Sequence, residues 1–208
     1  MPKQNRVTPF STLIAMPERG TLNGNRGCLH NELGQIRRQF VGQRWIICLL
    51  EFKGRRHPIM KPGRYTDLFF LDEATALAAG HRPCAECQRE RFNAFRHYWS
   101  KANSDFAKSI RPLAPVIDAV LHAERLGSHR FYRSFGDLPT GTFLSDNGTD
   151  AYLVVKKTLR LWTPAGYVRT EKKINFPARI LTPASVVRTL AAGYPVAIHP
   201  SELTLSAR

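Results

Sequence analysis

The chain has 208 residues, and its 31 Lys and Arg against 16 Asp and Glu give a formal net charge of +15. This length supports one large domain or two small ones, with a core that needs no disulfide. The longest apolar run, from Trp45 to Leu50, is too short to cross a bilayer. Residues 1–20 lack the sustained apolar stretch of a signal peptide. We therefore expect a cytoplasmic protein with no membrane partner, whose four cysteines are reduced.

The first half of the chain predicts short strands followed by two helices. In chain order we expect an irregular segment at 1–20, turns between short strands at 21–36, a strand at 44–53, and helices at 73–79 and 88–103. Asp72 can cap the first of these helices, and Gly80 can end it. On the second helix, Phe92, Phe95 and Trp99 recur at helical spacing, which favours core packing over base stacking.

The second half begins with a proline-punctuated stretch, 110–115, which is a candidate boundary between regions 1–109 and 110–208. The two regions could also pack as one domain. We expect a helix at 116–126, a β-meander at 141–167 with a turn at Asn147-Gly148, a strand at 178–183 and a final helix at 184–192. Without regular βαβ alternation, the fold class is α+β with small, mostly antiparallel sheets.

Two cysteines, Cys84 and Cys87, form a Cys-x-x-Cys pair directly after Arg82-Pro83. On a tight turn this spacing places two thiolates on one zinc ion, and further ligands must come from elsewhere in the chain. A redox pair stands instead at a helix N-terminus in a thioredoxin-like unit, which the surrounding sequence does not predict. A structural metal site is the preferred interpretation, with a redox pair and two ordinary thiols as alternatives.

The segment FFLDEATALAAGHRPCAEC resembles the distal half of the zinc-binding domain of Ada-type DNA-repair methyltransferases. The residues that fit the pattern are Phe70, Glu73, Ala74, Ala79, Gly80, Arg82, Pro83, Cys84 and Cys87. The upstream segment GNRGCLH more weakly resembles the start of similar modules attached to bacterial nucleases and competence proteins. The resemblance implies a small zinc-stabilised module that accompanies DNA-handling proteins, and it implies a ligand role for His30. Most of the chain also resembles a family of bacterial proteins, which supplies no mechanism.

The chain departs from the Ada-type pattern where a second upstream ligand is required. Gly34, four residues after His30, cannot bind metal, and the cysteine pair that accepts a methyl group in the family is not matched, so that activity is not implied. Cys28 and His57 are equally ranked alternatives for the remaining ligand. His81 and Cys48 follow, because Cys48 lies within an apolar run and reads as a buried core thiol. A fold that keeps these residues but has lost its metal is a further alternative.

The positive charge favours a polyanion partner, and the resemblance favours DNA. We expect a nucleic-acid-binding patch formed by Lys53, Arg55, Arg56, Arg89 and Arg96. Because no base-reading helix is evident, this patch should bind the backbone with little base specificity.

The best candidate for acid–base chemistry is the pair Asp118 and His122, which share one face of a predicted helix. This pair supports an alternative function as a hydrolase acting on nucleic acid or a nucleotide. An ordinary surface ion pair is the competing interpretation. A third possibility is a non-enzymatic protein-interaction domain whose charge is incidental.

Overall fold

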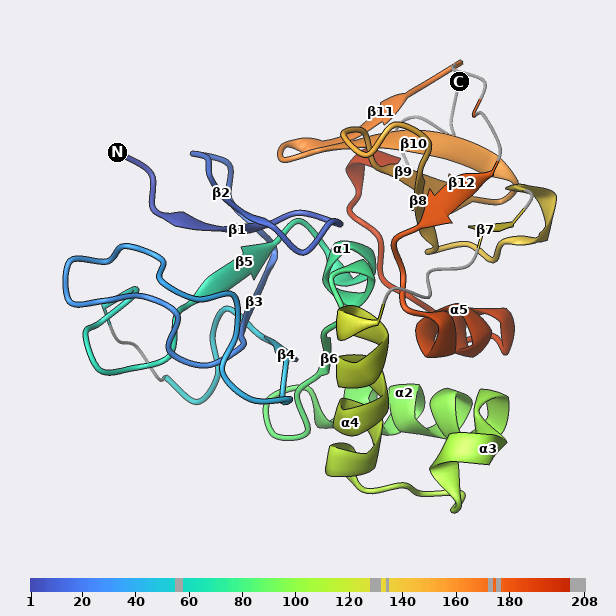
Figure 1. The fold of residues 1–208 in the computed structure, drawn as a ribbon, viewed down its shortest axis with the longest axis horizontal. Helices are drawn as coiled ribbons and strands as arrows, with labels where there is room; N and C mark the ends of the chain where they lie inside the picture. Colours follow the sequence, from blue (N-terminus) through green and yellow to red (C-terminus); the bar gives the residue numbers. More distant parts are fainter. Residues whose placement is uncertain (55–57, 128–131, 134, 172–173, 175–176, 203–208) are drawn as a thin grey trace.

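The computed structural model describes residues 1–54, 58–127, 132–133, 135–171, 174 and 177–202. In this part of the chain, two six-stranded sheets lie apart from each other, with helices gathered beside them (Figure 1). The predicted α+β class is confirmed. Within the described residues, no helix combines the length and apolar character needed to cross a membrane.

The first sheet is built from the N-terminal part of the chain and contains both parallel and antiparallel pairs. Its strands, in spatial order, are β2 (Leu13–Ala15), β1 (Gln4–Val7), β5 (Leu68–Phe70), β3 (Leu22–Asn25), β4 (Ile46–Cys48) and β6 (Arg82–Pro83). The pairs β1–β5 and β4–β6 are parallel, and the other neighbours are antiparallel. This edge arrangement of β4 and β6 positions the candidate site described below.

The second sheet is an antiparallel structure from the C-terminal part of the chain. Its order is β11 (Gly166–Arg169), β10 (Thr158–Thr163), β9 (Tyr152–Val155), β8 (Phe143–Ser145), β12 (Ala178–Ile180) and β7 (Tyr132–Arg133). The predicted meander corresponds to β8 through β11. Asn147 organises the β8–β9 turn, because its side-chain oxygen accepts hydrogen bonds from the backbone N–H groups of Thr149 and Asp150.

The helices fill the space beside the two sheets (Figure 1). They are α1 (Glu73–Ala78), α2 (Arg89–Ala102), α3 (Ser104–Ala107), α4 (Ala114–Leu126) and α5 (Ala184–Ala191), with a 3₁₀ turn η1 (Phe135–Asp137). The Asp72 side chain caps α1 by accepting from the backbone N–H of Thr75, as predicted. The proline-rich stretch at 110–115 runs directly into α4, because Pro115 is accommodated in its first turn.

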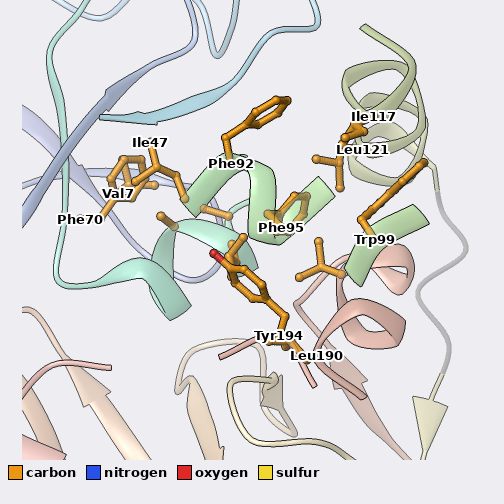
Figure 2. Packing of buried hydrophobic residues seen from close by; sticks show 14 of the residues in the cluster. Val7, Ile47, Phe70, Phe92, Phe95, Trp99, Ile117, Leu121, Leu190 and Tyr194 are labelled. Atoms are coloured by element: carbon orange, nitrogen blue, oxygen red, sulfur yellow. The ribbon is translucent and has the colours of Figure 1, made fainter. Parts of the chain in front are cut away.

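The main core joins residues from the beginning, middle and end of the chain. Phe92, Phe95 and Trp99 project from α2 into it, which confirms the core interpretation of that stripe (Figure 2). Other buried members come from the first sheet, α4 and the C-terminal segment, namely Val7, Ile47, Phe70, Ile117, Leu121, Leu190 and Tyr194. This core therefore crosses the candidate boundary near residue 110.

A buried histidine, His81, lies against the core residue Phe70. His81 is fully buried, and its Nε2 accepts a hydrogen bond from Arg26 Nε at 3.3 Å. Burial holds the pKa of His81 well below its ordinary value, and the nearby cations Arg26 and Arg125 add to the effect. The unfolded chain therefore binds a proton near pH 6.5 that the folded chain does not bind.

We predict that the free energy of unfolding falls as pH drops below about 6.5, by up to about 1.4 kcal/mol per pH unit for this one group. Urea denaturation across mildly acidic pH measures the slope. His81→Gln, which keeps an acceptor for Arg26, should flatten it. His97→Gln, at an exposed position on α2, is the matched control and should leave the slope unchanged. Equal slopes in wild type and His81→Gln would show that His81 does not cause the pH dependence.

Candidate metal centre

Three cysteines converge at the β4–β6 edge of the first sheet. Cys48 ends β4, Cys84 directly follows β6, and Cys87 precedes α2. Their sulfur atoms all lie within 4.8 Å of one another. We call Cys48, Cys84 and Cys87 the three-sulfur cluster. The structure brings Cys84 and Cys87 together as their spacing predicts, and it adds Cys48 as the third member.

The register of the sheet brings these cysteines together. β4 and β6 run parallel, with Ile46 opposite Arg82 and Ile47 opposite Pro83. The next residue along, Cys84, donates its backbone N–H to the Ile47 carbonyl at 2.8 Å. Parallel pairing continued by one residue therefore sets Cys84 beside Cys48.

The alternation of side chains along β4 turns Cys48 away from the hydrophobic core. Ile47 is fully buried in the core, whereas its neighbours Ile46 and Cys48 are half-buried on the other face of the strand. Asn25 and Asn23 on β3 lie opposite Ile46 and Cys48 in the antiparallel register. Cys48 therefore presents its thiol to the edge site rather than to the core.

The segment that leads into α2 is hydrogen-bonded to strand β4. Gln88 donates its side-chain N–H to the Ile47 carbonyl at 2.9 Å, and its backbone N–H bonds the Cys84 carbonyl at 3.1 Å. The backbone N–H of Glu86 also points at the Cys84 sulfur, 3.4 Å away. These contacts fix Cys84 and Cys87 relative to Cys48.

The three thiols share hydrogen bonds in a way that favours one thiolate. Hydrogen bonds from Cys48 and then Cys87, together with backbone N–H groups, hold the pKa of Cys84 well below its ordinary value. The same hydrogen bond to Cys84 raises the pKa of Cys48. A thiolate is the form that binds metal and the form that acts as a nucleophile. The cluster is therefore chemically suited to a soft or borderline cation.

The three-sulfur cluster lies in the wall of a cavity of about 1110 Å³. We call this space the basic cavity, because its lining contains four cationic side chains but only two carboxylates, those of Glu86 and Asp118. The cationic residues are Arg44, Lys61, Arg64 and Arg82. Phe52 and Tyr65 add aromatic side chains to the same lining.

A buried ion pair closes one side of this cavity. Arg82 Nε and Nη2 donate to the two carboxylate oxygens of Asp118 at 2.9 and 2.8 Å. The side chains are only 3% and 7% exposed, so this bidentate contact is shielded from water. It ties α4 to β6, immediately before Cys84.

The cluster that the structure forms contains neither His30, the expected third ligand, nor Cys28, one of the two alternatives for the fourth. His30 instead makes an isolated bridge with Ile36, and its Nδ1 lies 2.6 Å from the Thr66 hydroxyl. The Cys28 thiol donates to the His30 carbonyl at 3.6 Å. Both residues therefore make local contacts in the segment after β3 and do not belong to the three-sulfur cluster. The remaining candidate, His57, lies outside the described residues.

The low rank given to Cys48 was the main error of the sequence interpretation. Its place in the run WIICLL predicts a buried core thiol, but within this run only Trp45 and Ile47 are buried, and Cys48 alternates with them. The polar spacing Asn23-Gly24-Asn25 on the partner strand was the available signal that one face of this edge is open to solvent. His81, the other low-ranked candidate, is fully buried against Arg26.

The two members of the candidate catalytic pair, Asp118 and His122, contact different partners. Both oxygens of Asp118 are bonded to Arg82. His122 packs edge-on against Phe40, and its Nδ1 is buried without a hydrogen-bond partner in the described part of the chain. Partial burial and the cation of Arg125 lower the pKa of His122. The geometry thus gives Asp118 a structural partner, and the catalytic role of the pair stays a prediction.

The expected basic patch is only partly described. Lys53 and Arg89 are exposed, and Arg96 packs over the Phe92 ring and bonds Asn93. Two further members of the expected patch, Arg55 and Arg56, lie outside the described residues. The cationic residues that line the basic cavity, Arg44, Lys61, Arg64 and Arg82, were not among those expected.

Comparisons with protein-family models, with curated proteins and with solved structures found no match to this chain. The resemblance to Ada-type zinc domains therefore remains an expectation from the sequence motif. The candidate site is defined by its own geometry.

We predict that Asp118→Ala lowers the free energy of unfolding by about 3–5 kcal/mol, because it leaves Arg82 buried and unpaired. His122→Ala, one turn further along α4, is the comparison and should cost about 1 kcal/mol or less. Urea denaturation of both variants measures the difference. A small loss for Asp118→Ala combined with a large one for His122→Ala would contradict the structural role assigned to the ion pair.

Proposed function

We propose that this chain is a zinc-binding protein that binds nucleic acid at its basic cavity. The observation that carries the proposal is the position of the three-sulfur cluster in the wall of a cavity that also presents Arg44, Lys61 and Arg64. The proposed metal ligands and the proposed polyanion-binding side chains thus line the same cavity.

The donor set supports zinc. Three thiolates on one ion with Zn–S bonds of about 2.3 Å and tetrahedral angles lie roughly 3.8 Å apart. The observed separations, within 4.8 Å, require only small movements of the side chains to reach this geometry. Zinc is borderline-soft and favours sulfur and nitrogen ligands, whereas magnesium and calcium favour oxygen. The resemblance of the Cys-x-x-Cys segment to Ada-type zinc domains supports the same ion.

The charges around the cavity support a nucleic-acid partner. Arg44, Lys61 and Arg64 are exposed, and no carboxylate among the described residues pairs with them. Cations gathered in one place repel one another, and a phosphate backbone offsets that repulsion while releasing counterions. Phe52 and Tyr65 in the lining offer rings on which unpaired bases can stack. The Ada-type resemblance favours DNA and a role in its repair or processing.

We predict that the purified protein contains about one zinc ion per chain, and that Cys48→Ser and Cys84→Ser each reduce this to roughly a tenth or less. The matched control is Cys28→Ser, at another half-buried cysteine that lies outside the three-sulfur cluster. Elemental analysis by mass spectrometry after gel filtration gives the content. Zinc that persists in Cys48→Ser but disappears from Cys28→Ser would place the metal elsewhere.

We predict that the protein binds single-stranded DNA with an affinity that falls steeply with salt. Replacing Arg44, Lys61 and Arg64 together by Gln should reduce the slope of log affinity against log salt by about two, because each phosphate contact on a single strand contributes about 0.7. A control variant of equal charge replaces Lys101, Lys108 and Arg111, which are exposed at the end of α2 and in the stretch that leads to α4. Fluorescence anisotropy over a range of salt concentrations measures both.

Two results would contradict the proposed binding surface. One is an affinity that does not change between low and moderate salt. The other is an equal loss of slope in the control variant, which would mean that net charge rather than the basic cavity determines binding.

A further inference from the structure

We infer that the metal at the three-sulfur cluster keeps one coordination position open toward the basic cavity, where it binds an exchangeable ligand. The inference rests on the proposed zinc site. It goes beyond that proposal because structural zinc sites are closed by four protein ligands, whereas a zinc ion with three protein ligands can bind a ligand from solution.

The described residues offer three ligands to one metal ion. Among the described residues, the cluster contains three cysteines and no fourth Cys, His, Asp or Glu. Structural zinc sites are almost always closed by four protein ligands. Sites with three protein ligands complete the tetrahedron with water or substrate. The three cysteines among the described residues therefore match a zinc site with one open coordination position.

The position of the cluster gives the direction of the open position. Cys48, Cys84 and Cys87 are all half-buried, and all three line the basic cavity. On the other side of the edge, Ile47 and Pro83 are buried. An ion held by the three sulfurs is thus covered by protein on the core side and faces the cavity on the remaining side.

The chemistry of the site defines the ligand. Zinc with three thiolates takes water in the free protein and exchanges it for a nitrogen or sulfur donor. At about 1110 Å³, the cavity exceeds the usual range for small-molecule pockets, about 300–1,000 Å³. A nucleotide with an unpaired base has a ring nitrogen for the metal and a phosphate for Arg44, Lys61 or Arg64. One unpaired nucleotide of a single strand is therefore the ligand class that fits both features.

The experiment uses the full chain with cobalt(II) in place of zinc, and imidazole as the probe. The visible d–d bands of cobalt report its coordination, and the sulfur-to-cobalt charge-transfer band reports the bound thiolates. We expect imidazole to shift the d–d bands saturably while the charge-transfer intensity stays constant. Cys28→Ser should respond as wild type does. Spectra that do not change with imidazole would overturn the inference.

A variant at His57 and a competition with an oligonucleotide complete the experiment. His57→Ala, at the sequence-derived candidate for a fourth ligand, should leave the starting spectrum unchanged, and an altered spectrum would mean that the protein itself closes the site. A single-stranded oligonucleotide should weaken the imidazole response in wild type but not in the triple variant Arg44→Gln, Lys61→Gln, Arg64→Gln. An oligonucleotide that binds wild type without weakening that response would contradict the shared cavity.

The possible failures are distinguishable. If neither zinc nor cobalt binds in a Cys48-dependent manner, the proposed metal site itself is wrong. If cobalt binds at one per chain with thiolate charge transfer but does not respond to imidazole, the zinc proposal stands and only the open position is wrong.

Discussion

The buried ion pair between Arg82 and Asp118 is the contact on which the geometry of the candidate site depends. It joins α4 to the two-residue strand β6 through two hydrogen bonds of 2.9 and 2.8 Å. A strand this short has few ladder bonds of its own, so an outside contact must hold it in register against β4. That register sets Cys84 beside Cys48, and the turn into α2 then delivers Cys87. Desolvation makes such a pair costly to break, because either partner alone would be a buried, unpaired charge.

Two adjacent carboxylates, at the start of α1, hold this helix against the C-terminal part of the chain through hydrogen bonds. Asp72 accepts hydrogen bonds from the Tyr167 hydroxyl at 2.7 Å and the His199 backbone N–H at 2.9 Å. Glu73 accepts from the Tyr194 hydroxyl at 2.5 Å and is paired with Arg91 of α2. Both carboxylates are buried, so these bonds form in a low-dielectric setting where they are strong. The first sheet, with the three-sulfur cluster at its edge, therefore packs as one body with α2 and the C-terminal segment.

The features predicted correctly from the sequence are those set by local physical rules. Asp72 as a cap, the apolar stripe on 88–103 and the Cys84–Cys87 pair depend on residues a few positions apart. The third cysteine could not be ranked correctly in this way, because Cys48 joins the cluster through strand pairing across 36 residues of sequence. The same holds for Arg44 and Arg64, which line one cavity with the three sulfurs only in the folded chain. Composition predicted a polyanion partner without indicating which of the 31 cationic residues would gather in one cavity.

We propose that Cys48, Cys84 and Cys87 hold one zinc ion whose fourth position faces the basic cavity. X-ray absorption at the zinc edge of the purified protein tests this proposal most directly. We expect three sulfur neighbours at about 2.3 Å and one oxygen or nitrogen neighbour at about 2.0–2.1 Å, with the sulfur count falling to two in any zinc retained by Cys48→Ser. Four sulfur neighbours in the wild-type protein, or three that remain unchanged in Cys48→Ser, would contradict it.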